Sequence, residues 1–234
     1  MSGIAQGTKR GIDRGMVERM VRESLLKGWN PATGSKLSEA PAATAPKLVV
    51  NVSARHAHVT QADLEHLFGK GHQLKPFKML YQDGFFAAEE TLTIVGPRQR
   101  IISGLRILGP CRDHSQVELA FTDAIQLGID PPVRKSGDHR DSPGAYLIGP
   151  KGMIHMAKGV IRHERHVHMS AAEAAYFGVR DGDRMNLKVT SDCPTVLEGL
   201  LVRVSQGAKL EAHIDTDEGN ACNLAKATNM ELFR

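Results

Sequence analysis

Two short segments of the chain carry the same arrangement of histidines. RHAHVT (55–60) contains His56 and His58, and RHVHMS (165–170) contains His166 and His168. In a β-strand, side chains two residues apart point to the same face, so each pair would present two imidazoles together. Two imidazoles on one face form a bidentate site for a transition metal. A single His-x-His is commonly a chance feature of a surface or a core, but its recurrence in one repeated frame favours a metal site.

The two segments belong to a longer internal repeat with an offset of about 110 residues. Further along, residues 105–108 align with 200–203, and extending this alignment places Glu118 opposite His213. These two residues are therefore candidates for the third ligand of each group. Three protein ligands with an open position are typical of a catalytic metal. Imidazole and carboxylate ligands favour Zn²⁺, although Co²⁺, Ni²⁺ and Fe²⁺ accept the same donors.

Two arginines lie shortly before Glu118. The segment RILGPCR (106–112) supplies Arg106 and Arg112, and a guanidinium suits bidentate recognition of phosphate. An isolated arginine is more often part of a surface ion pair, but the place of Arg112 after a Gly-Pro turn and near a candidate ligand favours an anionic substrate. Cys111 has no counterpart in the second copy and no obvious His/Asp relay, so we interpret it as a spectator thiol rather than a nucleophile.

Several other kinds of site are not supported. The three cysteines, an odd number without a CxxC spacing, favour neither a disulfide framework nor a Cys-based zinc finger. The chain has no P-loop, no GxGxxG after a strand and no GxSxG elbow. The remaining histidines fall outside the repeated frame and are interpreted as solvated or hydrogen-bonded bystanders: His66, His72, His114, His139, His155 and His163.

The elements that would position these residues are short strands. Runs rich in β-branched residues alternate with Gly and Pro at 48–53, 91–96, 100–109, 116–121, 145–149, 185–190 and 197–205. This spacing indicates a mainly-β sandwich or barrel. Helical patterns after residue 50 are confined to 60–68 and 170–177, each preceded by a Thr or Ser cap. With the internal repeat, we predict two pseudo-symmetric β-barrel domains, 48–140 and 141–234, with the site where they meet.

A different composition precedes the strands. Residues 9–28 have apolar side chains at helical spacing, which predicts a short amphipathic helix, and 30–47 is a Pro-, Ala- and Ser-rich linker. The region 1–47 is thus either a docking peptide with its linker or a frayed extension. No apolar run reaches the length of a membrane span or a secretory signal, so we expect a cytoplasmic protein without a membrane partner. A net charge of +4 without a basic stripe does not favour a nucleic-acid partner.

In combination, these motifs resemble a known family. ARHAHVT, ERHVHMS, SGLRILGPCRDHSQVEL and LEAHIDTDEGNAC, with the N-terminal amphipathic helix, are similar to the PduL-type phosphate propanoyltransferases, the phosphotransacylases of bacterial microcompartments. The resemblance covers nearly all of 48–228. It implies two pseudo-symmetric β-barrels, two bound zinc ions, and interconversion of acyl-CoA and phosphate with acyl phosphate and CoA. Propanoyl-CoA is the expected substrate.

The resemblance also implies roles for individual residues. One zinc would be held by His56, His58 and Glu118, and the other by His166, His168 and His213. Arg112 would bind phosphate, and CoA would contact Ser53, Lys78, Arg106, Leu108 and Asn220. Residues 9–28 would be an encapsulation peptide that contacts shell or core enzymes and directs the protein to the microcompartment lumen. A homo-oligomer, at least a dimer, is expected.

Our mechanistic hypothesis is direct displacement. Arg112 and a metal would hold phosphate near the thioester carbonyl, a metal would stabilise the oxyanion, and zinc would capture the departing CoA thiolate. Two alternatives stay open. A zinc-dependent thioester or amide hydrolase would use the same ligands without needing phosphate. A non-catalytic compartment protein would use zinc structurally, although such sites normally have four protein ligands.

Overall fold

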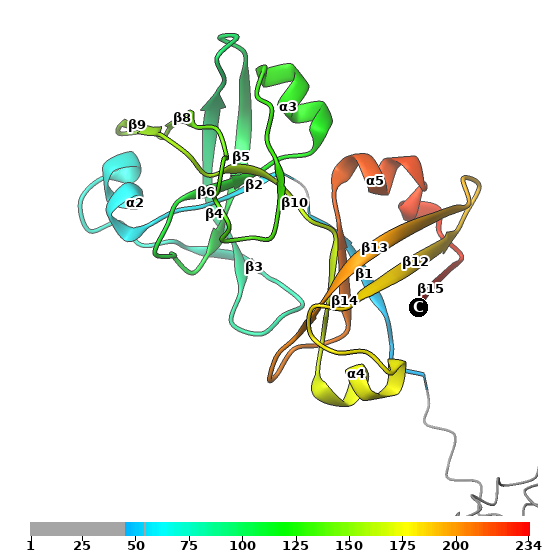
Figure 1. Ribbon diagram of the computed structural model, residues 1–234. Coiled ribbons are helices and arrows are strands. Elements are labelled where there is room, and N and C mark those ends of the chain that lie inside the picture. The colour runs from blue at the N-terminus through cyan, green and yellow to red at the C-terminus, as the bar shows by residue number, and fades with distance from the viewer. Residues whose placement is uncertain (1–44, 54) are drawn as a thin grey trace, which may run out of the picture. The chain divides into compact units, whose positions relative to one another are not determined.

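The computed structural model describes residues 45–53 and 55–234. The helix predicted at 9–28 and almost all of the predicted linker lie outside the described residues. The described chain is mainly β, with two curled, barrel-like sheets and a few short helices, so the predicted fold class is confirmed (Figure 1). Residues 46–234 make up one compact unit that contains both sheets.

The larger sheet has nine strands and carries the first His-x-His segment. Its order is β7-β10-β6-β2-β5-β4-β8-β9, and β3 pairs with β4. The bounds are β2 (His56–His58), β3 (Pro76–Met79), β4 (Phe86–Val95), β5 (Ile101–Gly109), β6 (Gln116–Glu118), β7 (Val133–Arg134), β8 (Ala145–Ile148), β9 (Met153–Met156) and β10 (Val160–His163). The short strand β2 lies between β5 and β6, so its histidines are in the middle of the sheet.

The smaller sheet has six strands and carries the second His-x-His segment. Its order is β1-β14-β11-β13-β12-β15. The bounds are β1 (Val49–Val52), β11 (His166–Met169), β12 (Arg184–Thr190), β13 (Thr195–Val204), β14 (Glu211–Ile214) and β15 (Asn229–Phe233). Here β11 lies between β13 and β14, as β2 lies between β5 and β6 in the larger sheet. The local topology around both histidine pairs is therefore the same.

Each sheet also contains a strand from the other half of the chain. β1 directly precedes β2 in the sequence but pairs in parallel with β14 of the smaller sheet. β10 directly precedes β11 but pairs in parallel with β6 of the larger sheet (Figure 1). We call β1 and β10 the exchanged strands. Because β8 and β9 also belong to the larger sheet, the sheets do not divide the chain at residue 140.

Each sheet encloses its own hydrophobic core. The core of the larger sheet includes Leu64, Leu92, Ile94, Leu105 and Ile107, and the core of the smaller sheet includes Met169, Met185, Leu187, Leu200 and Ile214, all with at most 2% of their surface exposed. Burial of a large apolar side chain contributes about 1.5–3 kcal/mol. Two separate cores mean that each histidine pair is set in a sheet that is packed independently on its own apolar face.

The two helices predicted after residue 50 are present. α2 (Gln61–Phe68) begins after Thr60, whose hydroxyl accepts from the Asp63 backbone N–H. α4 (Ala171–Phe177) begins with a capping box between Ser170 and Glu173. Each helix directly follows a histidine strand, so the cap fixes where that strand ends.

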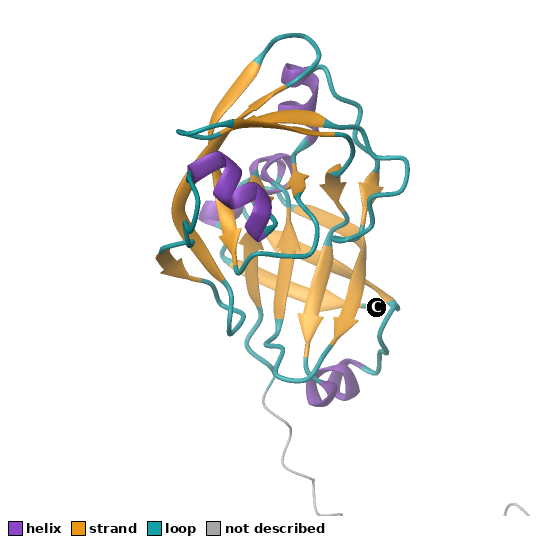
Figure 2. Ribbon diagram, turned by 90° about the vertical axis from the view of Figure 1, so that its left-hand side faces the viewer, coloured by secondary structure: helices purple, strands orange, loops and turns teal. Residues whose placement is uncertain are grey.

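Two further helices and one 3₁₀ turn were not predicted. The strand predicted at 116–121 is shorter than expected, because β6 ends at Glu118. α3 (Phe121–Leu127) begins three residues later. α5 (Thr216–Ala221) has a capping box formed by Asp215 and Glu218, and η1 (Leu224–Lys226) follows it. These elements span only two turns or less, which is too short for helical periodicity to be read from the sequence. Figure 2 shows the short helices placed around the strands.

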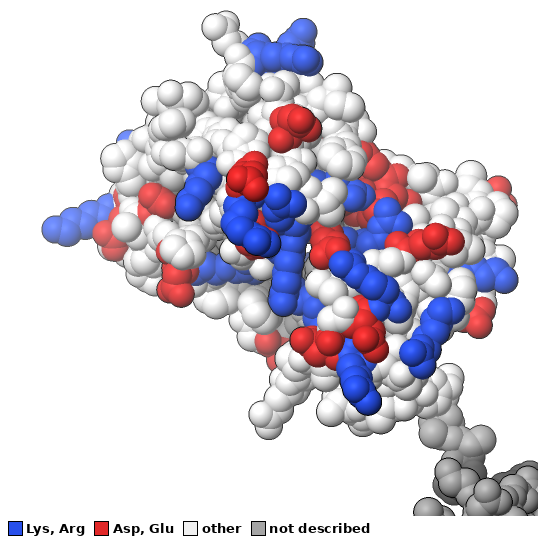
Figure 3. All heavy atoms as spheres, viewed as in Figure 1, with Lys and Arg blue, Asp and Glu red and all other residues white. Residues whose placement is uncertain are grey.

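The surface mixes charges of both signs. Figure 3 shows Lys and Arg side chains interspersed with Asp and Glu over the face viewed. Among the described residues, no helix combines the length and the apolar composition that crossing a membrane requires.

Candidate active site

The first group consists of His56, His58 and Glu118. His56 lies opposite Glu118 in the antiparallel pair of β2 and β6. One potential ligand atom from each of the three residues lies within 4.8 Å of the other two, and all three side chains are buried. Glu118 Oε2 is 3.4 Å from His56 Nε2, and Glu118 Oε1 is 3.9 Å from His58 Nε2. The two imidazoles and the carboxylate therefore converge.

The second group consists of His166, His168 and His213. His166 lies opposite His213 in the antiparallel pair of β11 and β14, and the ligand atoms again lie within 4.8 Å of one another. The His166 and His213 rings are stacked with centroids 4.9 Å apart, and His168 meets both rings edge-on. The third member of each group thus comes from the same register position of an equivalent strand.

The protonation states of both groups suit metal binding. Burial lowers the pKa of His58 to about 3 and that of His168 to about 4, with nearby His56 and His213 acting in the same direction. Burial alone would raise the pKa of Glu118, but His56, His163 and His58 hold it well below its usual range. Neutral imidazoles and an ionised carboxylate are the forms that bind metal ions.

Hydrogen bonds fix the orientation of the rings. Nδ1 of His58 contacts the Leu108 carbonyl at 3.3 Å, Nδ1 of His166 contacts the Glu164 carbonyl at 2.8 Å, and Nδ1 of His213 contacts Ser53 Oγ at 3.0 Å. Such contacts on one ring nitrogen leave the other available to a metal.

His213 Nε2 supplies a direct test of whether a metal fits. This atom is buried and makes no hydrogen bond within the described chain, although Glu211 Oε2 lies 3.2 Å away. A buried ring nitrogen beside a carboxylate, in a group whose ligand atoms lie within 4.8 Å of one another, fits a divalent metal ion.

Arg112 lies close to the first group. Its Nη1 donates to Ser136 Oγ at 2.9 Å. Burial and the nearby Arg203 guanidinium lower the pKa of Arg112, and the Glu118 carboxylate raises it. Arg203 and Glu118 are therefore close enough to Arg112 to interact with it electrostatically. Two partly buried arginines next to the candidate ligands form an anion-binding environment.

The sequence interpretation assigned no role to Arg203, Ser136 or Gln116. Arg203 lies opposite His168 in the parallel pair of β11 and β13, and this residue was already part of the aligned segment 200–203. Gln116 donates from Nε2 to Glu118 Oε1 at 2.6 Å and to Ser136 Oγ at 3.0 Å. For Arg203 the repeat carried a usable signal. For Ser136 we see none, because it lies in a loop without a counterpart in the alignment.

The five residues expected to contact CoA are spread over several elements. Ser53 follows β1 and contacts His213, while the Leu108 carbonyl contacts His58. The Arg106 guanidinium donates to the Ala88 carbonyl at 2.6 Å and lies 5.0 Å from the Phe77 ring centroid. Lys78 is exposed on β3.

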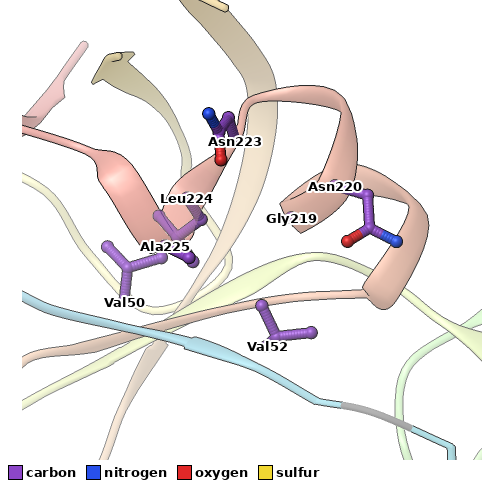
Figure 4. Close-up of a pocket in the computed structure, with 7 residues that line it drawn as sticks. All are labelled: Val50, Val52, Gly219, Asn220, Asn223, Leu224 and Ala225. Carbon is purple, nitrogen blue, oxygen red and sulfur yellow. The ribbon is translucent and has the colours of Figure 1, made fainter. Parts of the chain in front are cut away.

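Only Asn220 of these five lines the pocket between β1 and α5. This pocket has a volume of about 420 Å³, and Val50, Val52 and Gly219 also line it (Figure 4). Because Ser53 directly follows Val52, the pocket adjoins the strand that leads to the second group.

Cys111 and His163 lie among the residues that we interpreted as bystanders. Burial raises the pKa of the Cys111 thiol, and its Sγ contacts Gln61 Oε1 at 3.7 Å, which agrees with a spectator thiol. His163 does not fit the bystander interpretation. It is 2% exposed, and its Nδ1 lies 3.6 Å from Glu118 Oε2.

Comparisons with known proteins place the chain in a family. A family model described as phosphate propanoyltransferase matches residues 49–225. The chain is 56% identical over 225 residues to a phosphate propanoyltransferase of Planctopirus limnophila, covering 95% of this chain and 92% of that protein. It is 48% identical over 180 residues to one of Thermotoga maritima (76% and 85%) and 40% identical over 207 residues to one of Rhodopseudomonas palustris (88% and 91%). The chain belongs to the phosphate propanoyltransferase family and is an acyltransferase.

Proposed function

We propose that the chain interconverts a short-chain acyl-CoA and phosphate with the acyl phosphate and CoA, using one divalent metal ion at each of the two groups. Propanoyl-CoA is the acyl donor that the relatives' names suggest. The observation that carries the metal part of the proposal is the convergence of ligand atoms within 4.8 Å in both groups, next to two arginines.

Both groups have the donors that zinc binds. His56, His58 and Glu118 would hold one ion, and the second group of three histidines would hold the other. When bound, such ions supply a Lewis acid for the thioester carbonyl and a favourable site for a thiolate. With only three protein ligands, each ion would keep an open position for a substrate.

Phosphate would be bound by the chain's own guanidinium groups. Arg112 follows β5 of the larger sheet and donates to Ser136. Arg203 lies on β13 of the smaller sheet, opposite His168. The two cations therefore belong to different sheets. Their charge neutralises phosphate and orients one of its oxygens toward the carbonyl carbon. In the reaction that we propose, a phosphate oxygen forms the new bond to the acyl carbon, the C–S bond breaks, and the electron pair leaves with the CoA sulfur.

No protein nucleophile is needed in this reaction. Cys111 is the cysteine nearest in sequence to Arg112, and burial keeps it in the thiol form. Direct attack by phosphate therefore accounts for transfer without an acyl-enzyme intermediate.

The pocket lined by Asn220 is the part of the surface that we assign to CoA. Its apolar wall, formed by Val50 and Val52, suits the methylene and methyl groups of the pantetheine arm, and the Asn220 amide can bind the arm's polar groups. Gly219 lets α5 pack closely against β1 at this wall, since a Cβ atom there would lie 2.6 Å from Val52 Cγ2.

The identity of the acyl product tests the proposed function. The protein is incubated with propanoyl-CoA and phosphate, and hydroxylamine is added to trap acyl phosphate as the hydroxamate. We expect hydroxamate in proportion to the CoA released. Free propanoate without hydroxamate would instead identify a hydrolase, and neither product would identify a non-catalytic protein.

We also propose that the N-terminal region directs the protein into a bacterial microcompartment. Support comes from the amphipathic spacing within residues 9–28 and from the linker that follows. The full chain should co-purify with microcompartment shells, and a chain that begins at residue 46 should not. Equal recovery of both chains would contradict this assignment.

A further inference from the structure

Each exchanged strand, at its end or directly after it, brings a polar residue to the third member of the opposite group. In the pair of β1 and β14, Asn51 lies opposite His213, and Ser53 comes two residues later. In the pair of β10 and β6, Ile161 lies opposite Glu118, and His163 comes two residues later. Ser53 and His163 therefore occupy equivalent positions in the two sheets.

The side chains at these two positions both lie near the third member of the opposite group. Ser53 Oγ lies 3.0 Å from Nδ1 of His213, and Nδ1 of His163 lies 3.6 Å from Oε2 of Glu118. In both cases a side chain from an exchanged strand faces the residue that completes the ligand set. The repeat thus extends beyond the ligands to the residues behind them.

The surroundings of Glu118 show what His163 restrains. Gln116 Nε2 donates to Oε1 of Glu118 at 2.6 Å, so that oxygen is fixed from one side. Oε2 lies between His56 Nε2 at 3.4 Å and His163 Nδ1 at 3.6 Å. Without His163, the 3.4 Å contact with His56 would be the one of these two that remains to hold Oε2.

The placement of His163 is costly unless it serves a purpose. The side chain is only 2% exposed, and its Nε2 makes no hydrogen bond within the described chain. A buried ring nitrogen without a partner costs about 1–3 kcal/mol. An apolar residue at the end of β10 would avoid this cost, so the ring's contact with Glu118 calls for an explanation.

We propose that His163 is a positioning residue, which holds the Glu118 carboxylate toward His56 and His58 so that the first group is ready for its metal ion. Ser53 does the same for His213 in the second group. The inference rests on the proposed metal binding. Residues behind a ligand typically change metal affinity about 10- to 100-fold when they are removed.

The test measures metal affinity rather than activity. The H213A background removes one ligand of the second group, so that binding to the first group dominates. Apo protein is titrated with Co²⁺, and the dissociation constant and the visible absorption bands of the bound ion are recorded. H163L should weaken Co²⁺ binding about 10- to 100-fold and change the band positions.

Two amide variants separate positioning from folding. At position 163, the amide nitrogen of an Asn side chain can occupy the place of the histidine Nδ1. The amide nitrogen of a Gln side chain corresponds to the histidine Nε2. H163N should therefore restore most of the Co²⁺ affinity, and H163Q should restore less. H72L is the matched control, because His72 forms another His–Glu pair of the larger sheet, at 2.7 Å from Glu90 Oε1. It should leave Co²⁺ affinity unchanged.

Failure of the inference and failure of the proposed function give different results. If neither the natural sequence nor the H213A protein binds Co²⁺, metal binding fails and the inference fails with it. If both bind Co²⁺ but H163L does so with the affinity and spectrum of its parent, only the role of His163 is wrong. Equal losses for H72L and H163L, or equal rescue by H163N and H163Q, would also overturn it.

Discussion

His166 lies directly opposite His213, and the two rings are stacked at 4.9 Å with 9° between their planes. In the equivalent place of the larger sheet, His56 lies opposite Glu118. The repeat has therefore kept the register and changed one donor from imidazole to carboxylate. A carboxylate also lies beside the second group, since Glu211 Oε2 is 3.2 Å from His213 Nε2.

Removal of the third donor should empty one group at a time. His213→Ala and Glu118→Ala should each lower the bound zinc from two ions to one per chain, because each leaves only two ligands in its group. Metal analysis after dialysis measures this. His155→Ala, at an exposed histidine beside Tyr146, is the control and should keep both ions. Two ions in the His213→Ala protein would remove His213 from the ligand set.

Arg112→Ala should affect phosphate rather than the metal. Loss of a charge-assisted contact costs about 1.5–3 kcal/mol, so the apparent KM for phosphate should rise about 10- to 100-fold with zinc content unchanged. Arg140→Ala is the matched control, since Arg140 is 83% exposed and pairs with Asp138. Steady-state rates over a range of phosphate concentrations give the values. Loss of zinc from the Arg112→Ala protein would contradict the assigned role.

Arg162 joins the exchanged strand β10 to the smaller sheet. Its guanidinium binds Asp215 and Glu218, both at 2.7 Å, and all three side chains are buried. Arg162→Met would leave Asp215 without this cation, while Glu218 would keep Arg165 at 2.8 Å, so the free energy of unfolding should fall by about 3–5 kcal/mol. Arg184→Met breaks the more exposed pair with Glu164 and should cost less than about 1 kcal/mol. Urea denaturation measures the free energy of unfolding of both variants. Equal losses would show that the buried ion pairs of Arg162 stabilise the fold no more than the exposed pair of Arg184.

Glu90 should make stability depend on acidic pH. Burial alone would raise its pKa, but the Lys75 backbone N–H and the His72 side chain lower it below its usual 4.5. Because the folded pKa is the lower one, ionised Glu90 stabilises the fold above the unfolded pKa, and this contribution is lost as the pH falls through the folded value.

The variant Glu90→Gln tests this sign. The difference in unfolding free energy between the natural chain and Glu90→Gln should be largest at about pH 7 and should shrink below about pH 4.5. Glu89→Gln, at the exposed neighbouring position, should show no such trend. A difference of the same size at both pH values would contradict the role of Glu90.

The sequence predicted the histidine pairs and the helices next to them because those signals are local. The strand period places His56 and His58 on one face, and Thr60 and Ser170 cap the following helices. The long-range placement of Glu118 followed from the internal repeat, since its alignment with His213 reproduces the register of the two sheets.

Other features depend on contacts that local patterns do not contain. β1 reads as the first strand of its own half, and nothing in its composition indicates parallel pairing with β14 more than 150 residues away. For the same reason His163 looked unrelated to Glu118, because only the exchange of β10 brings them together. The short helix α5 was missed because one capping box and six residues do not establish a period.

Thiol release from propanoyl-CoA tests the central claim most directly. The assay is run on zinc-loaded protein with and without phosphate, and again after treatment with a chelator and after zinc is restored. The account predicts release that requires phosphate, disappears with the chelator and returns with zinc. Release at the same rate without phosphate, or after the metal has been removed, would contradict metal-assisted transfer to phosphate.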